Sequence, residues 1–376
     1  MSTPPTCPAF VVTSPTGTLL ADGIATRFPE APAAQRALSA GSAPIVVGAL
    51  PFHPQHPAAL FVPHSVRTPA RLPAHRQSAE SAMQVVAELP DAEEHRARIR
   101  LALDQLAAPA SELRKVVLAR ALRLAADAPV DADAVLHRLV AADPSCYGYL
   151  ADLTAAGDGY RGAVLVGASP ELLVARDGPR VICRPFAGSA PRIPEDPIAD
   201  AASGHALASS AKNRHEHLLV VDQLRAALEP LCDDVDIDST PQLSRTAAVW
   251  HLNTSITGRL RDSATTALDL ALALHPTAAV GGVPTAAAVE LIEQLEGDRG
   301  FYAGAVGWCD ASGDGQWVVS IRCAQLSADR RSAVAHAGGG IVAQSDPADE
   351  LAETATKFST ILSALGAALP TAAPTD

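Results

Sequence analysis

The feature that most restricts the fold of this chain is a run of three glycines at positions 338–340, followed closely by an acidic segment. Glycine has no Cβ atom and tolerates positive φ, so the run predicts a turn where the backbone closely approaches another group. Pro347 and the acidic residues after it predict the start of a helix. On that helix Glu350, Glu353 and Lys357 recur at i, i+3 and i+7 and therefore share one face.

This helical face has two interpretations. Two carboxylates with an ammonium one turn further along the helix can hold a hard cation beside an anionic ligand. The simpler interpretation is a solvated face on which Glu353 and Lys357 form an ordinary i,i+4 pair, because most such pairs are surface features. The helix alone favours the simpler interpretation, so the rest of the chain has to decide.

Composition excludes several classes of protein. The 376 residues, 48% of them apolar, are enough for one large domain or two ordinary ones. The net charge is −12 and no run of Lys or Arg occurs, so we expect no nucleic-acid partner. Six scattered cysteines without a CxxC pair indicate reduced core residues of a cytoplasmic protein. The chain has no basic segment before an apolar run and no apolar stretch of membrane-spanning length, so we expect no signal peptide and no membrane partner.

Apolar runs, prolines and glycines predict alternating strands and helices. Strands are expected at 44–52, 111–122, 147–153, 162–167, 172–176, 250–258, 301–310 and 316–326, the last two joined by a hairpin signal. Helices are expected at 78–107 (divided by Pro90), 131–141, 203–228 and 286–296. The Pro- and His-rich segment 53–77 is expected to be a surface connection.

Two ionisable side chains are expected at unusual places. In a strand Lys115 shares a face with apolar Val117 and Ala119, so it either extends outward to solvent or is held in a cleft, where burial makes an amine easier to deprotonate. Glu171 follows Pro170, which interrupts a strand, and a bend of this kind either directs a side chain into a cleft or forms a surface turn.

Further polar residues suggest anion binding. Alternation in the expected strand 316–326 places Arg322 with apolar residues on one face, where it needs an anionic partner. The turn at 187–189 offers backbone N–H groups to an anion. Three familiar sites are excluded. A zinc protease is excluded because position 219 is Leu, so the HExxH motif is absent. A calcium loop is excluded because Ile321 stands at the position of its last ligand. A Rossmann dinucleotide site is excluded because no GxGxxG occurs.

Together the residues supply a lysine, a glutamate at a bend, two carboxylate-bearing helices, an inward arginine and two glycine turns. This set suits a dicarboxylate substrate that carries a magnesium ion, with an acid and a base beside it. The ordered motifs that contain these residues are KVVLAR (115–120), SPELL (169–173), AGSAPR (187–192), KNRHEH (212–217), WHLNT (250–254), LHPT (274–277), FYAGAVGWCD (301–310), IRCA (321–324), the glycine run and ELAETATK (350–357).

This ordered set, over residues 44–363, resembles the chorismate-utilising enzymes, and most closely the isochorismate synthases of siderophore and menaquinone pathways. The resemblance implies an α+β fold, with a single large domain of antiparallel sheets packed centrally and helices outside. It also implies a variable N-terminal segment at 1–43, a chorismate-binding catalytic domain at 44–365 and a disordered tail at 366–376. We expect a monomer whose substrate is chorismate.

The resemblance also implies a role for each site residue. Lys115 is the general base that activates water for attack at C2 of chorismate, and Glu171 is the general acid that protonates the departing C4 hydroxyl. Glu216 and Glu353 match ligands of a Mg²⁺ cofactor, and Glu350 matches an outer carboxylate at the metal. The expected substrate-binding residues are Ser189, His251, Thr277, Tyr302, Arg322, Gly338, Gly340 and Lys357.

The sequence departs from the family pattern at three positions. Asn213 stands where Asp or Glu is usual, Ala190 where Arg is common, and Ile193 where Gly is frequent. Asn213 lacks the usual charge beside the metal and so bears on metal affinity. Ala190 and Ile193 bear on the shape of the loop.

Related activities leave alternatives open. Salicylate synthases carry out the same hydration and then eliminate pyruvate, although GALPF (48–52) and GWCD (307–310) favour release of isochorismate. Amine-transferring relatives often carry a nucleophilic lysine where this chain has Ala187. A non-catalytic anion-binding relative is disfavoured because Lys115 and the three acidic motifs are intact.

Overall fold

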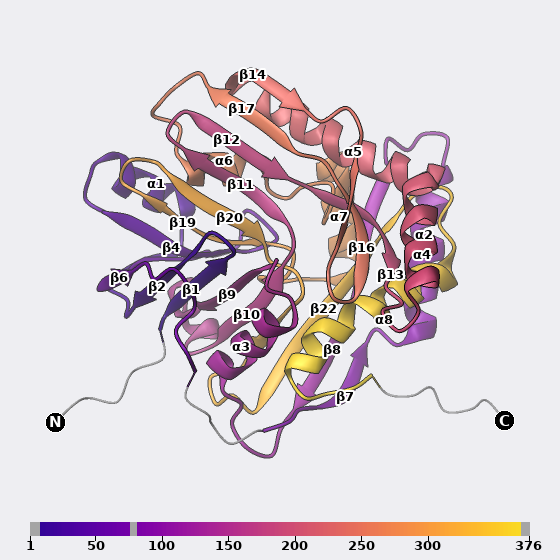
Figure 1. The fold of residues 1–376 in the computed structure, drawn as a ribbon, viewed down its shortest axis with the longest axis horizontal. Helices are drawn as coiled ribbons and strands as arrows, with labels where there is room; N and C mark the ends of the chain where they lie inside the picture. The colour runs from indigo at the N-terminus through magenta and orange to yellow at the C-terminus, as the bar shows by residue number, and fades with distance from the viewer. Residues whose placement is uncertain (1–7, 76–80, 370–376) are drawn as a thin grey trace.

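The computed structural model describes residues 8–75 and 81–369, and two large antiparallel sheets form its centre (Figure 1). The ten-stranded sheet has, in spatial order, β18 (Gly282–Val283), β8 (Lys115–Ala125), β22 (Ser332–Ile341), β21 (Cys323–Leu326), β10 (Val164–Ser169), β9 (Tyr147–Asp152), β1 (Phe10–Ser14), β2 (Gly17–Asp22) and β6 (Ser65–Arg67); β7 (Gln84–Leu89) also pairs with β8.

The second large sheet has nine strands, and a small third sheet stands beside the helices. The nine are β14 (Cys232–Ile237), β17 (Ile256–Leu260), β12 (Arg180–Arg184), β11 (Leu172–Asp177), β20 (Gly315–Val319), β19 (Ala305–Asp310), β4 (Ile45–Leu50), β5 (Ala59–Val62) and β3 (Thr26–Phe28). The small sheet contains β13 (Phe186–Pro191), β16 (Val249–Asn253) and β15 (Gln242–Arg245).

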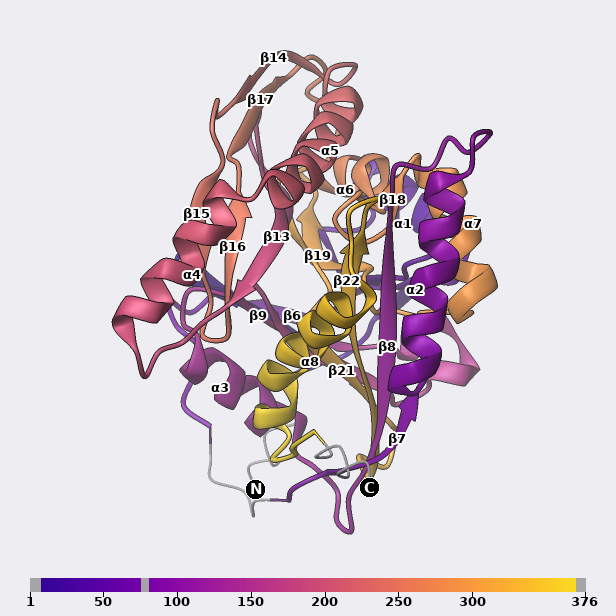
Figure 2. The ribbon, with the colours of Figure 1, turned by 90° about the vertical axis from the view of Figure 1, so that its right-hand side faces the viewer.

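Helices cover the outer surfaces of the sheets (Figures 1 and 2). They are α1 (Ala31–Ser39), α2 (Ala92–Ala107), α3 (Ala132–Ala142), α4 (Pro197–Ser209), α5 (Ala211–Leu228), α6 (Ala267–Leu274), α7 (Thr285–Glu296) and α8 (Pro347–Ala364), with short 3₁₀ turns at Thr154–Ala156 and Asp158–Tyr160. Side-chain caps fix where several helices begin, because they accept hydrogen bonds from first-turn N–H groups. Asp91, Asp131, Ser210 and Asp346 do this for α2, α3, α5 and α8.

Two apolar clusters hold these layers together. The larger includes the fully buried side chains of Phe61 and Trp317. The smaller packs Leu136 of α3 and Phe358 of α8 against the ten-stranded sheet. Burying large aromatic and branched side chains on both sides of a sheet fixes the positions of the helices, and α8 is thereby held against β22 (Figure 2).

The predicted fold class is confirmed: the structure is α+β, with antiparallel sheets in the middle and helices outside. The expected strands at 44–52, 147–153 and 162–167 correspond to β4, β9 and β10. The lysine-containing strand is β8, and the helix predicted after Pro347 is α8.

Three predictions about the helices and the connection at 53–77 are wrong. The first half of the expected helix at 78–107 contains strand β7, and the helix begins only at Ala92, after Pro90. The expected helix 203–228 is two helices, because Ser210 adopts an extended conformation, ending α4 and capping α5. The surface connection at 53–77 contains β5 and β6.

The predicted domain boundaries remain a prediction. Residues before 44 contribute β1 and β2 to the ten-stranded sheet and β3 to the nine-stranded one. Most of the predicted tail, 370–376, lies outside the described residues. No helix in the described ranges combines the length and apolar character needed to cross a membrane.

Candidate active site

Ten of the predicted site residues line one cleft. The walls come from the bend before β11, from β13 and β16, from α5 and α8, and from the glycine-rich part of β22. About 550 Å³ of space lies between them, including the part open to solvent. The ten residues are Glu171, Ser189, Glu216, His251, Tyr302, Arg322, Gly338, Gly340, Glu353 and Lys357.

The glycine run lies in a strand, which corrects the predicted turn. Gly338 and Gly340 pair with Ala119 and Val117 of β8. A Cβ atom on Gly340 would lie 2.1 Å from Glu216 Oε1, far inside van der Waals contact. One on Gly339 would lie 3.0 Å from Glu350 Oε2. Glycine is therefore needed here because the strand passes directly against acidic side chains, rather than because of positive φ.

Each of the three glutamates predicted at the metal is paired with a lysine. Neither partner of Lys115–Glu216 is exposed by more than a tenth of its side chain, which excludes the outward orientation for Lys115. Three lysines thus face three glutamates around the cleft. The N–O distances are 3.0 Å for Lys115–Glu216, 2.5 Å for Lys212–Glu350 and 2.5 Å for Lys357–Glu353.

The two glutamates of α8 have opposite electrostatic environments. Burial and the charge of Glu353 raise the pKa of Glu350, although Lys212 opposes this. Burial alone would raise the pKa of Glu353, but Lys357 and a hydrogen bond from Ser189 Oγ, 2.7 Å long, outweigh it and lower the pKa. Glu353 is therefore the carboxylate of α8 that stays charged at the cleft.

Glu171 is directed inward by the bend at Pro170, as the first of its two interpretations predicts. Its side chain is buried, and the backbone N–H of Phe186 donates to Oε1 over 3.4 Å. Burial raises the pKa of Glu171 to about 7, against the opposing effects of that N–H and of Lys115. A carboxylic acid with this pKa is partly protonated at neutral pH.

Arg322 reaches the cleft by a route the sequence did not predict. The expected continuous strand 316–326 ends at Val319, and β21 begins at Cys323 in the other large sheet. Arg322 lies at this crossover with φ +54. It is buried, and no carboxylate in the described ranges lies within 4.0 Å of its guanidinium. A buried guanidinium without such a partner is suited to bind an anionic ligand.

Two neighbours complete this side of the cleft. His251 Nε2 lies 3.5 Å from Arg322 Nη2, and burial, followed by the charge of Arg322, lowers the pKa of His251 far below its usual value. The imidazole is therefore neutral. Tyr302 stacks on His336 at 4.8 Å between ring centroids, and burial raises the pKa of its phenol.

Three predicted residues lie behind the cleft surface. Lys115 is fully buried beneath Gly340, with Cε 3.0 Å from the position of a Cβ there. Glu350 contacts Lys212 as described above. Thr277 is buried, and its carbonyl accepts the N–H groups of Val280 and Gly281, so it shapes the loop that carries Val280 into the wall.

The glutamates fit a magnesium ion. Glu216 and Glu353 line the cleft, and Glu350 Oε2 is buried without a hydrogen-bond partner among the described residues. The three carboxylates do not converge within 4.8 Å of one another. Mg²⁺ tolerates this, because it retains several waters and takes only one or two protein carboxylates.

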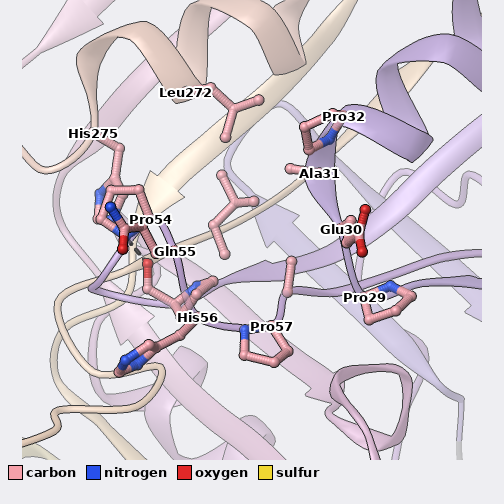
Figure 3. A pocket seen from close by; sticks show the side chains of 13 residues that line it. Pro29, Glu30, Ala31, Pro32, Pro54, Gln55, His56, Pro57, Leu272 and His275 are labelled. Carbon is pink, nitrogen blue, oxygen red and sulfur yellow. Dashed lines mark hydrogen bonds between the residues drawn. The ribbon is translucent and has the colours of Figure 1, made fainter.

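A separate hollow lies between α1 and the loop after β4 (Figure 3). Five prolines line it together with Glu30 and Gln55. The ring nitrogen Nε2 of His275 is held by the carbonyls of Pro51 and Phe52. This hollow lacks the paired acid and base of the cleft, so the cleft is the better candidate.

Lys212 is the member of the site that sequence reasoning left without a role. Its position one helical turn before Glu216 was the available signal. Asn213, beside it, donates its side-chain N–H to Ser210 Oγ and so contributes to the cap of α5.

The fold and this cleft define a chorismate-utilising protein, and comparison agrees. The family described as "Chorismate binding enzyme" matches residues 45–366, so the chain belongs to that family. The predicted family is thereby confirmed.

Three relatives illustrate the similarity. A Mycobacterium tuberculosis protein with the provisional name isochorismate synthase MenF is 65% identical over 96% of both chains. Isochorismate synthase DhbC of Bacillus subtilis is 41% identical over 95% of this chain and 94% of the relative. The solved structure of MenF, the menaquinone-specific isochorismate synthase of Escherichia coli, has a TM-score of 0.82 at 26% identity, covering 96% of this chain and 89% of that one.

Proposed function

We propose that this chain is a magnesium-dependent isochorismate synthase, which adds water at C2 of chorismate and expels the C4 hydroxyl. The observation that carries the proposal is the combination of a buried Glu171 in the cleft wall, whose pKa is about 7, with a fully buried Lys115 behind the wall at Gly340. The names of the relatives, which cover nearly the whole chain, support the same reaction.

Glu171 supplies the proton for the leaving group. Hydroxide is a poor leaving group, so the C4 oxygen has to be protonated as its bond to carbon breaks. A positioned acid accelerates such a step by about 10²- to 10⁴-fold, most effectively when its pKa is near the working pH. Burial gives Glu171 that property.

Lys115 takes the proton from the attacking water. Its Nζ contacts Glu216 Oε1 at 3.0 Å, yet makes no aligned hydrogen bond with any described residue. A general base accepts a proton only in its deprotonated form, so in the proposed reaction it is the free amine of Lys115 that takes the proton of the attacking water. Glu216 holds the lysine in place through the same contact.

Glu216 and Glu353 would hold the magnesium ion, with Glu350 behind them. When bound, Mg²⁺ supplies positive charge that holds a carboxylate of the substrate. The charges favour this pairing, because Mg²⁺ would balance the two carboxylates of chorismate. The cleft therefore gains no net charge when both bind.

Arg322 and Lys357 bind the carboxylates of the substrate from the protein side. Arg322 has no carboxylate partner within reach among the described residues, and Lys357 also donates to the carbonyl of Gly338 at 2.7 Å. Neutral His251 and the Tyr302 hydroxyl offer hydrogen bonds at the ring. The proposal also includes a monomeric, cytoplasmic protein, a location that suits its buried free cysteines at 146, 183, 232, 309 and 323.

The proposal is tested by incubating the protein with chorismate and Mg²⁺ and separating the products by chromatography. Isochorismate should accumulate, and isochorismate supplied alone should regenerate chorismate, because exchanging one allylic alcohol for another has an equilibrium constant near unity. Pyruvate and salicylate formed as fast as chorismate disappears would show a salicylate synthase instead. No turnover would contradict both activities.

A further inference from the structure

A second group of side chains of the kinds that bind metals lies outside the cleft, where His75 meets the first two turns of α3. His75, Asp133 and His137 place candidate ligand atoms within 4.8 Å of one another. Asp133 Oδ2 is 2.6 Å from His75 Nδ1 and 3.8 Å from His137 Nε2. All three side chains are between 19% and 26% exposed, so the group is shielded yet reachable by an ion.

The helix fixes two of these residues relative to each other. Asp133 and His137 are four residues apart on α3, so they share one face. Asp131 caps the helix, since its Oδ1 accepts the N–H groups of Asp133 and Ala134. Its other oxygen, Oδ2, lies 3.5 Å from His75 Nε2. A fourth oxygen donor is therefore within reach of the group.

The two imidazoles are arranged for a shared partner. Their ring centroids are 5.3 Å apart and the planes are tilted by 36°. His75 Nε2 is buried and makes no aligned hydrogen bond with any described residue.

We propose that His75, Asp133 and His137 form a binding site for a divalent transition metal such as Zn²⁺, with Asp131 as an additional oxygen donor. Two imidazoles and a carboxylate are a common ligand set for zinc, whereas Mg²⁺ prefers oxygen ligands alone. The site is thus chemically distinct from the carboxylates of the cleft.

Its position indicates a stabilising role. The metal would join the segment at His75 to α3, 58 residues further along the chain. On the same helix Arg138 donates to the carbonyl of Ala364, the last residue of α8, over 2.7 Å. The metal would therefore hold His75 onto a helix that supports α8.

The test is a Zn²⁺ titration of chelator-treated, full-length protein in saturating Mg²⁺, with a chromophoric chelator as competitor. The wild-type protein should take up one more equivalent of Zn²⁺ than His137→Ala. Losing an outer partner of a metal ligand costs about 10- to 100-fold in affinity, so loss of a ligand in His137→Ala or Asp133→Asn should cost at least about tenfold. His205→Ala, which alters an exposed histidine on α4, is the matched control and should bind as the wild type does.

Two further measurements keep the result decisive. Zn²⁺ should raise the melting temperature of the wild type and not that of His137→Ala, which should keep its chorismate turnover with Mg²⁺. Circular dichroism checks the fold, and His137→Gln replaces the alanine variant if that variant is misfolded. Equal Zn²⁺ uptake by wild type and both His137 variants would overturn the proposal. Uptake abolished by Glu353→Gln instead would place the metal in the cleft and also overturn it.

Discussion

The cleft and the α3 group both gather acidic side chains, but they differ in what balances the charge. At the cleft each of the three glutamates predicted at the metal has a lysine partner, and the pairs are largely buried. On α3 the partners of Asp133 are imidazoles, which give up a proton near neutral pH and bind soft and borderline metals. The comparison shows that the partner of a carboxylate, more than the carboxylate itself, decides whether a site suits a hard cation and a proton transfer or a zinc-like ion.

The largest expected effect concerns the residues that only the cleft contains. Glu171→Gln and Lys115→Ala should each lower kcat by at least about 10²-fold, because each removes one proton transfer. Zn²⁺ uptake at α3 should stay unchanged in both. Steady-state kinetics measure the first effect, and Glu195→Gln, an exposed glutamate, is the control. Near-normal kcat in a folded Lys115→Ala would make this lysine a structural residue of β8.

A second prediction addresses the space beside Glu216. Gly340→Ala would place a Cβ atom 2.1 Å from Glu216 Oε1, so the carboxylate has to move away from β22. We expect a loss of activity of at least about tenfold, with weaker magnesium dependence, because one predicted ligand is displaced. Gly159→Ala is the matched control, since nothing lies within 4 Å of its added Cβ. If both variants kept full activity, the close approach of β22 would have no role in the reaction.

The third prediction separates the two metal sites. Glu353→Gln should raise the Mg²⁺ concentration needed for half-maximal activity by about 10- to 100-fold, because a neutral amide is a poorer magnesium ligand than a carboxylate. His137→Ala should leave that concentration unchanged. Activity is measured against Mg²⁺ concentration after chelation, and EDTA should abolish turnover in both proteins. Full activity in excess EDTA would remove magnesium from the account.

The smallest expected effect is that a rise in pH changes the two sites in opposite directions: it lowers kcat/KM at the cleft and increases Zn²⁺ uptake at α3. Glu171 has to be protonated to act as an acid, and burial raises its pKa to about 7, so kcat/KM should fall as pH rises through about 7. The α3 group needs neutral imidazoles, so its Zn²⁺ uptake should fall as pH decreases. A pH profile of kcat/KM beside a Zn²⁺ titration at each pH measures both. If the residual activity of Glu171→Gln fell with pH at the same midpoint as that of the wild type, a group other than Glu171 would cause the pH dependence.

The sequence predicted which residues line the cleft better than it predicted which strands and turns carry them. The lysine-containing strand and α8 were predicted correctly because their signals are local, although alternation left the orientation of Lys115 open. Arg322 was expected inside one strand, yet it lies where the chain crosses between sheets, and alternation carries no information about which sheet a residue joins. The glycine run was expected to turn, because the sequence does not show that the side chains of Glu216 and Glu350 lie against it.

The sequence did not predict the α3 group for a related reason. Asp133 and His137 are four residues apart and could have been noticed as a pair. His75 lies in a Pro- and His-rich segment without periodicity, and only the folded chain brings it to α3. Contacts between distant, irregular segments are the part of a site that local patterns cannot supply.

The central claim is that water attacks C2 while Glu171 helps to expel the C4 hydroxyl, and isotope labelling tests it most directly. Chorismate is converted with Mg²⁺ in H₂¹⁸O, and the product is analysed by mass spectrometry before the reverse reaction becomes significant. The account predicts isochorismate that contains one solvent oxygen, in the hydroxyl group at C2. Isochorismate formed without ¹⁸O would mean that the hydroxyl migrates within the substrate, and it would contradict the roles assigned to Lys115 and Glu171.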